Sequence, residues 1–191
     1  AGFVRAKVKV AADCPLGEHP VRVRTKGGIT ELRTFYVGPF PVVNRVRPKA
    51  GEPHQKLPLN STVASSVPNE SQEIFTIDAK KGQRLSAEIE SMRLGRGFYD
   101  PYIEILDTKG FILSRSDDTK LFIQDCYASA IVPEDGTYTI KVRETSYGSI
   151  GLYRMHVGTF ARPTAVYPGG GQAGKDLQVK FIDQATGDFV Q

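Results

Sequence analysis

The sequence predicts an all-β protein, and three observations support this fold class. Apolar and polar residues alternate in many short segments, turn signals return about every eight to twelve residues, and no segment keeps a helical period. This spacing is typical of β-sandwiches and jelly rolls. The apolar content of 40% is ordinary for a globular fold.

The chain begins with predicted strands that carry an excess of positive charge. Residues 3–12 alternate as a half-buried strand, residues 13–17 form a turn, and the alternation returns over residues 21–25, followed by a strand from Arg33 to Val37. If the first two strands pair antiparallel, five basic side chains share one exposed face. They are Arg5, Lys7, Lys9, Arg22 and Arg24. This basic stripe is either an anion-binding surface or a solvated sheet face whose charges discourage aggregation.

A proline-containing linker, Gly38-Pro39-Phe40-Pro41, precedes a second series of strands. A short strand is predicted at residues 63–67, a firmer one begins with Phe75, Ile77 and Ala79, and after a turn at residues 80–82 the alternation continues over residues 85–90. The apolar side chains of this last segment are expected to face the core: Leu85, Ala87 and Ile89. Its polar side chains are expected to face solvent: Ser86, Glu88 and Glu90.

The clearest element is a β-hairpin within residues 100–118. Tyr102 to Leu106 is one strand, Asp107 to Gly110 is the turn, and Phe111 to Ser114 is the return strand. Five aspartates surround this hairpin: Asp100, Asp107, Asp117, Asp118 and Asp125. They either stabilise turns or belong to a metal site, and their spread over several turns favours the first interpretation.

Further strands are predicted at residues 125–132, 138–142 and 152–157. Residues 159–168 repeat the linker chemistry, and Gly169-Gly170-Gly171 leads to a strand at residues 177–181 rather than to a helix, so a phosphate-binding loop is not expected. We therefore predict three parts. Residues 1–38 end one Ig-like sandwich, residues 39–158 form a complete sandwich, and residues 159–191 begin another. A further hypothesis is that the two end pieces form one sandwich together.

Four motifs follow one another within residues 40–158. They are FTIDAKKGQRLSAEIES, DPYIEILDTKGFILSRSDD, VPEDGTYTIKVRETSYG and GLYRMHVG. Together they resemble the bacterial pre-peptidase C-terminal (PPC) domain, in the version found in large surface proteins of planctomycete-type bacteria. The flanking stretches DCPLGEHPVRVRT and PTAVYPGGGQAGKDLQV resemble partial Ig-like modules of the IPT/TIG type. The resemblance implies a jelly-roll-type β-sandwich, similar to the collagen-binding domain of clostridial collagenases, with partial Ig-like segments at both ends.

Relatives in this family often hold calcium through a Glu-x-Glu-Pro-Asn linker and an Asp-x-Asp-x-Phe strand. At the corresponding places this chain has RVRPK, residues 45–49, and SQEIF, residues 71–75. Because arginine cannot ligate a cation, the calcium site is predicted to be lost, and no cofactor or metal is expected. We expect instead that Arg45 or Arg47 replaces the ion as the positive partner of Glu73, in a partly buried, bidentate ion pair.

The sequence offers no recognisable catalytic constellation. His19, His54 and His156 fall in a turn, a loop and a strand, and neither an HExxH nor a GxSxG motif is present. Cys14 and Cys126 either form a disulfide or remain separate thiols. Acids near Cys126 are expected to raise the pKa of its thiol rather than activate it. We therefore predict that the chain is not an enzyme.

These observations predict a non-catalytic, extracytoplasmic binding, targeting or spacer module of a larger bacterial surface or secreted protein. The expected partners are a polysaccharide or an extracellular protein, together with other modules of the parent protein. A nucleic-acid partner is not expected, because no aromatic residues interleave with the basic stripe. No apolar run approaches the roughly 20 residues of a membrane span.

Tyrosines expected to be exposed near the hairpin are the candidate ligand-binding residues. They are Tyr99, Tyr102, Tyr127 and Tyr147. Tyrosine offers a flat amphipathic surface to sugars or extended peptides, although half-burial at a sheet edge would explain the same residues. Two alternative functions remain: a structural protein that associates through its incomplete end strands, and an accessory domain of a secreted hydrolase.

Overall fold

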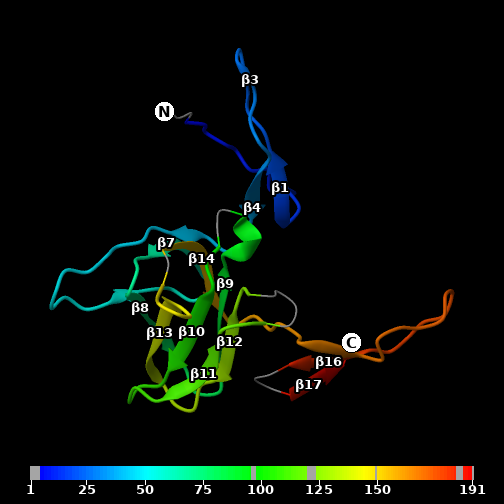
Figure 1. Cartoon of the computed structure of the whole chain (residues 1–191). Coiled ribbons are helices and arrows are strands. Elements are labelled where there is room, and N and C mark those ends of the chain that lie inside the picture. Colours follow the sequence, from blue (N-terminus) through cyan, green and yellow to red (C-terminus); the bar gives the residue numbers. More distant parts are fainter. Residues whose placement is uncertain (1–4, 96–97, 120–123, 149, 184–186, 191) are drawn as a thin grey trace. The chain divides into compact units, whose positions relative to one another are not determined.

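The computed structural model describes residues 5–95, 98–119, 124–148, 150–183 and 187–190. Apart from the short 3-10 helix η1 (Met92–Leu94), all regular secondary structure in these residues is β (Figure 1). The predicted all-β class is therefore confirmed. The chain divides into two compact units, Ala1–Pro39 and Phe40–Gln191.

Among the described residues of the first unit, from Arg5 on, four short strands pair antiparallel in twos. Strand β1 (Gly17–Val21) pairs with β4 (Arg33–Val37), and β2 (Arg24–Thr25) pairs with β3 (Gly28–Ile29). The predicted strand at residues 3–12 is wrong where it can be judged, since residues 5–10 have no strand structure and are exposed. Phe3 and Val4 lie outside the described residues. An alternating pattern produces a half-buried strand only where another layer covers its apolar side.

The predicted basic stripe fails for the same reason. Arg5, Lys7 and Lys9 lie in this irregular segment, Arg22 lies between two strands, and Arg24 belongs to β2. All five side chains are exposed, but they do not share the face of one antiparallel pair.

The second unit contains a sandwich of two five-stranded sheets (Figure 1). Sheet I has the strand order β11 (Ile112–Ser116), β10 (Pro101–Leu106), β13 (Gly136–Glu144), β8 (Gln72–Ala79), β6 (Gln55–Lys56). Sheet II has the strand order β12 (Tyr127–Ile131), β9 (Arg84–Glu90), β14 (Gly151–Gly158), β7 (Ser61–Val67), β5 (Val42–Val43). The short strands β5 and β6 pair parallel with their neighbours, and the other pairs are antiparallel.

The sandwich core follows the alternation that the sequence shows. In β13, Tyr138, Ile140 and Val142 are buried, while the residues between them are partly exposed. The predicted hairpin is confirmed, because β10 and β11 pair antiparallel on either side of the Asp107–Gly110 turn. Burial of these inner faces is the main stabilising contribution, at about 25 cal/mol per Å² of apolar surface.

A third small sheet follows the sandwich. It contains β15 (Ala165–Tyr167), β16 (Lys180–Asp183) and β17 (Gly187–Val190) in that order. The strand predicted at residues 177–181 therefore begins later than expected, at Lys180. Whether this sheet and the first unit are partial Ig-like modules, and whether the predicted boundaries at 38 and 158 delimit domains, stay predictions.

Among the described residues, no helix is long and apolar enough to cross a membrane.

Candidate functional site

Glu73 occupies a core position at one end of sheet I. It lies on β8 with the same inward orientation as Phe75 and Ile77, and its side chain is only 5% exposed. Its Oε2 atom accepts a hydrogen bond of 2.6 Å from the hydroxyl of Tyr153, which projects from β14 of sheet II. A carboxylate at such a position needs charged partners, because desolvation of an unpaired ion is costly.

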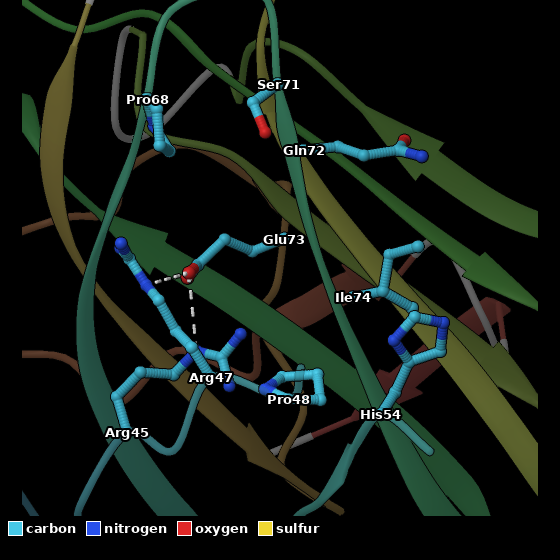
Figure 2. A pocket seen from close by; sticks show the side chains of 9 residues that line it. All are labelled: Arg45, Arg47, Pro48, His54, Pro68, Ser71, Gln72, Glu73 and Ile74. Atoms are coloured by element: carbon cyan, nitrogen blue, oxygen red, sulfur yellow. Dashed lines mark hydrogen bonds and ion pairs between the residues drawn. The ribbon is translucent and has the colours of Figure 1, made fainter. Parts of the chain in front are cut away.

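Two arginines supply this positive charge. The Nε atoms of Arg45 and Arg47 lie 3.3 Å and 3.2 Å from Oε1 of Glu73, and Figure 2 shows both side chains approaching that carboxylate. The guanidinium of Arg45 also lies over the ring of Phe75, 4.6 Å from its centroid. The sequence-based expectation of an ion pair at these residues therefore corresponds to contacts in the structure.

The expected bidentate geometry is wrong. Both arginines approach the same oxygen of Glu73 through Nε, and the other oxygen accepts a hydrogen bond from the hydroxyl of Tyr153. Arg45 turns its Nη1 atom to the Val46 carbonyl and to Oε1 of Gln55.

The Glu73 pocket is the hollow beside this cluster, with a volume of about 240 Å³. Its lining is shown in Figure 2: Arg45, Arg47, Pro48, His54, Pro68, Ser71, Gln72, Glu73 and Ile74. These residues do not fit a calcium ion, because one carboxylate oxygen faces two guanidinium groups and the other accepts a hydrogen bond from a hydroxyl. That the ion pair replaces a family calcium site, and that the chain needs no cofactor, stay predictions.

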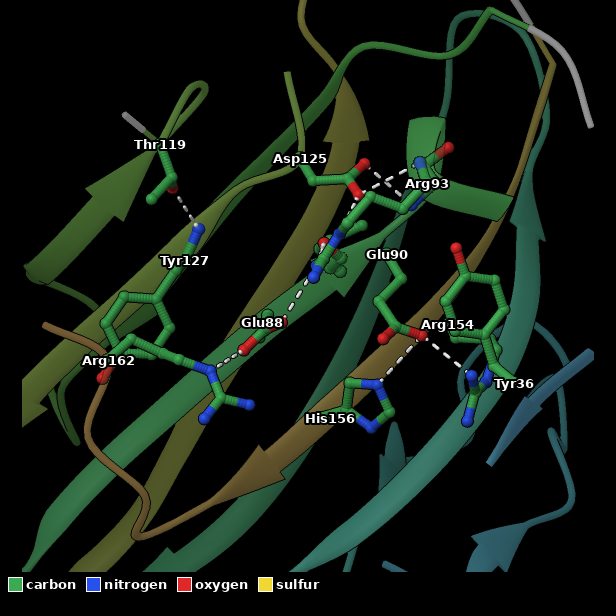
Figure 3. A network of polar contacts seen from close by, with 12 residues as sticks. Tyr36, Glu88, Glu90, Arg93, Thr119, Asp125, Tyr127, Arg154, His156 and Arg162 are labelled. Atoms are coloured by element: carbon green, nitrogen blue, oxygen red, sulfur yellow. Dashed lines mark hydrogen bonds and ion pairs between the residues drawn. The ribbon is translucent and has the colours of Figure 1, made fainter. Parts of the chain in front are cut away.

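A second polar cluster lies on the outer face of sheet II. Glu88 is 2% exposed and binds two arginines, Nη2 of Arg93 at 2.9 Å and Nε of Arg162 at 2.6 Å (Figure 3). Nε of Arg93 also lies 2.6 Å from Oδ2 of the fully buried Asp125. Burial lowers the pKa of Arg93, but hydrogen bonds to Asp125 and Glu88 outweigh this effect and raise it. We call Glu88, Arg93, Asp125 and Arg162 the Glu88 cluster.

The adjacent end of the same face holds Glu90. Its Oε2 atom lies 2.9 Å from Nη1 of Arg154 and 3.1 Å from Nε2 of His156 (Figure 3). The Nδ1 atom of His156 is 2.8 Å from the hydroxyl of Thr62. Burial tends to raise the pKa of Glu90, but the hydrogen bond and charge of His156 and the charge of Arg154 lower it overall.

The sequence-based expectation that Ser86 and Glu88 face solvent is wrong. Both are buried because residues that follow β14 cover them. The Phe160 carbonyl accepts a hydrogen bond of 2.7 Å from Ser86, and Arg162 binds Glu88. The alternation identified the two faces of β9, but it could not identify a covering segment more than 70 residues away.

The two connections of the sandwich meet on this face. Phe40, at the start of the unit, lies 5.6 Å from Phe160, measured between ring centroids, and 6.4 Å from His156. Phe160 also contacts Tyr127, with centroids 6.1 Å apart. The chain therefore enters and leaves the sandwich at neighbouring points.

The four candidate tyrosines do not form one exposed surface. Tyr99 and Tyr127 are each 1% exposed, so the expected exposure is wrong for both. The ring of Tyr99 stacks on Tyr153 in the core, and Tyr127 is covered by Phe160. Burial strongly raises the pKa of Tyr99, which has no hydrogen-bond partner for its hydroxyl among the described residues.

The other two candidate tyrosines lie together around an arginine. The guanidinium carbon of Arg143 is 3.9 Å from the ring centroid of Tyr102 and 4.6 Å from that of Tyr147. Tyr147 is 43% exposed. These contacts leave a smaller aromatic surface than the sequence suggested, and its role as a ligand site stays a prediction.

The aspartates and cysteines have structural surroundings. Oδ1 of Asp107 accepts hydrogen bonds from the backbone of Lys109 and Phe111, which is typical turn chemistry. The part of the chain that is described has no group of three or more acidic, histidine or cysteine side chains arranged to hold a metal. Both cysteines are free, and burial, followed by the charge of Asp125, raises the pKa of Cys126.

No protein-family model and no curated protein matches this chain. Solved structures similar to it include PliG of Aeromonas hydrophila, a periplasmic inhibitor of g-type lysozyme, at 17% identity and a TM-score of 0.41, covering 62% of this chain and 96% of that one. They also include the pre-peptidase C-terminal domain of collagenase from Bacillus anthracis, at 14% identity and 0.42, covering 59% and 99%. PliG of Salmonella Typhimurium matches at 14% identity and 0.33, covering 61% and 97%.

Proposed function

We propose that this chain is a non-catalytic binding module of a larger extracytoplasmic protein. The observation that supports it best is the position of the two chain connections, since Phe40 and Phe160 are in contact on sheet II. A module with adjacent entry and exit points adds little length to a chain, so it suits presentation of a surface better than spacing.

The buried charged groups support a non-catalytic role. Glu73, Glu88 and Asp125 are all engaged by arginine side chains, an arrangement typical of structural ion pairs. The buried thiol of Cys126 has a raised pKa and is therefore a poor nucleophile.

The test is binding of the labelled chain to an array of polysaccharides, collagen and other matrix proteins, at low and physiological salt, with and without calcium. We expect binding to at least one polymer that survives physiological salt, with no release of product from it. Turnover of any polymer, or the absence of binding to all of them, would overturn the proposal.

A further inference from the structure

We propose that the Glu73 pocket binds a singly charged oxyanion, a carboxylate or a sulfate ester, on an acidic polysaccharide, with Arg47 as the residue that contacts it. This inference rests on the binding function proposed above and assigns it a site and a class of ligand. It depends on the charge balance, the exposure and the remaining hydrogen-bonding capacity of the residues around the pocket.

The charges that line the Glu73 pocket do not cancel. Two guanidinium groups, those of Arg45 and Arg47, approach the single carboxylate of Glu73. One positive charge therefore remains at the mouth of the pocket. A nearby anion of one charge would restore the balance, and the attraction is stronger here than in bulk water because part of the site is desolvated.

The two arginines are not equivalent. The Arg45 side chain is 11% exposed, and its guanidinium is occupied by Glu73, Gln55 and the Val46 carbonyl. The Arg47 side chain is 52% exposed. Its Nη2 atom donates to the carbonyl and hydroxyl oxygens of Ser66, and no described residue accepts a hydrogen bond from its Nη1 atom. The guanidinium of Arg47 therefore keeps a hydrogen-bond donor, its Nη1 atom, available to a ligand.

Glu73 cannot take up this remaining capacity. Its Oε2 atom is held by the hydroxyl of Tyr153, and both arginines share Oε1. Its side chain is only 5% exposed and bonds to Tyr153 of the opposite sheet, which holds the carboxylate inward and keeps it from turning outward to form a closed pair with Arg47. Arg47 therefore faces an opening that a carboxylate or sulfate oxygen from outside can enter.

The remaining walls favour a sugar acid over a purely inorganic ion. Ser71, Gln72 and His54 provide hydroxyl, amide and imidazole groups, which suit the hydroxyls of a sugar, and Pro48 and Pro68 provide apolar surface. A neutral sugar would leave the charge of Arg47 uncompensated. A doubly charged phosphate would exceed it.

The experiment is calorimetric titration of the full chain at physiological salt with three probes. These are a galacturonate oligomer, its fully methyl-esterified neutral form, and a sulfated galactan oligomer. We expect one or both charged oligomers to bind and the methyl ester to bind at least tenfold more weakly. The charged oligomer that binds better identifies the group.

Two variants locate the site. Arg47→Gln is expected to weaken binding of the charged oligomers at least tenfold, whereas Arg33→Gln, which removes an exposed arginine of the other compact unit, should leave it unchanged. Glu73→Gln, checked for folding by circular dichroism, should tighten anion binding, because it raises the surplus charge of the pocket from one to two.

Several results would overturn the inference. One is equal binding of the methyl ester, and another is an equal loss of binding in the Arg33 and Arg47 variants. A third is binding of an acidic peptide through Arg47 when no oligosaccharide binds. Binding of a neutral polymer that Arg47→Gln leaves intact would remove this site but keep the proposed binding function. If no polymer on the array binds, both the proposed site and the proposed binding function are overturned.

Discussion

The Glu73 pocket and the Glu88 cluster use the same chemical groups in different ratios. Both hold nearly inaccessible carboxylates against arginines. In the Glu88 cluster, two arginines face two carboxylates, Glu88 and Asp125, and every one of these side chains bridges to another. In the Glu73 pocket, two arginines face one carboxylate, and one of them is half exposed.

The difference shows how charge balance distinguishes structural ion-pair networks from sites that can bind a ligand. A network whose charges balance satisfies its own groups, so its members contribute to stability and offer little to a ligand. A network at the surface whose charges do not balance keeps a hydrogen-bond donor and a charge available to a ligand. The following predictions test this distinction, in order of decreasing expected effect.

Asp125→Ala should be the most destabilising change. It removes an acceptor for Arg93 and for the backbone amides of Ser91 and Met92, and it leaves a partly buried guanidinium without one of its two carboxylates. We expect a loss of about 3 to 5 kcal/mol in the free energy of unfolding. Urea denaturation followed by circular dichroism measures it. Asp117→Ala, at an exposed turn, is the control and should change stability by less than about 0.5 kcal/mol.

Glu73→Gln should cost less, about 1 to 3 kcal/mol. The glutamine oxygen can still accept a hydrogen bond from Tyr153, and Arg47 can extend into solvent. A cost equal to that of Asp125→Ala, in the same denaturation experiment, would show that the two sites do not differ in the way we describe.

Glu90→Gln should lower stability by about 1 to 2 kcal/mol at pH 7, because it removes a carboxylate that Arg154 and His156 share. The pKa of Glu90 is lowered in the folded chain, so its contribution is present above the unfolded value of about 4.3 and is lost as the pH falls through the folded pKa. The difference between wild type and variant should therefore shrink in acid. A difference that is constant from pH 7 to below the folded pKa would contradict this account.

Asp100→Asn should act in the opposite direction. Burial, followed by the charges of Asp118, Glu144 and Asp117, raises the pKa of Asp100, and its Oδ1 atom has no hydrogen-bond partner among the described residues. The neutral form is thus favoured in the folded state, and stability falls as the pH rises from the unfolded pKa through the folded one. We expect the asparagine to raise the free energy of unfolding by about 0.5 kcal/mol at pH 7 and to have no such effect at low pH. Thermal melts at both pH values test this.

Arg47→Gln should have the smallest effect on stability, below about 0.5 kcal/mol, because the side chain is half exposed and Arg45 remains beside Glu73. A loss of more than 2 kcal/mol in the denaturation experiment would show that Arg47 is mainly structural. A stability change below about 0.5 kcal/mol also makes Arg47→Gln suitable for the binding experiment.

Local patterns predicted much of the sandwich. The alternation of Tyr138, Ile140 and Val142 gave the inner face of β13, and the turn from Asp107 to Gly110 gave the hairpin. Both depend on neighbours in sequence, such as backbone hydrogen bonds to the Asp107 side chain. The expectation that Arg45 or Arg47 pairs with Glu73 came from the arginines at residues 45–49, where the family that the sequence resembles has glutamates.

The errors have a common physical origin in contacts between distant segments. Residues 5–10 alternate, but no layer covers their apolar side. The alternation of β9 predicts that Glu88 faces solvent, but Arg162, which is distant in sequence, covers it. Tyr99 was expected at the surface, but its ring packs where a Cβ atom on Gly151 would lie only 1.8 Å away. Periodicity describes the two sides of a strand and does not tell which side another segment will cover.

The contact between Phe40 and Phe160 has a mechanical consequence. If the flanking segments were pulled apart, tension would first act on this aromatic contact and on the ion pair of Arg162 with Glu88, rather than along the strands of the two sheets. Below the force that separates them, the load would pass between the two connections and into β9 of sheet II, whereas Glu73 lies on β8 of sheet I, so its pocket would keep its shape while the chain is under strain.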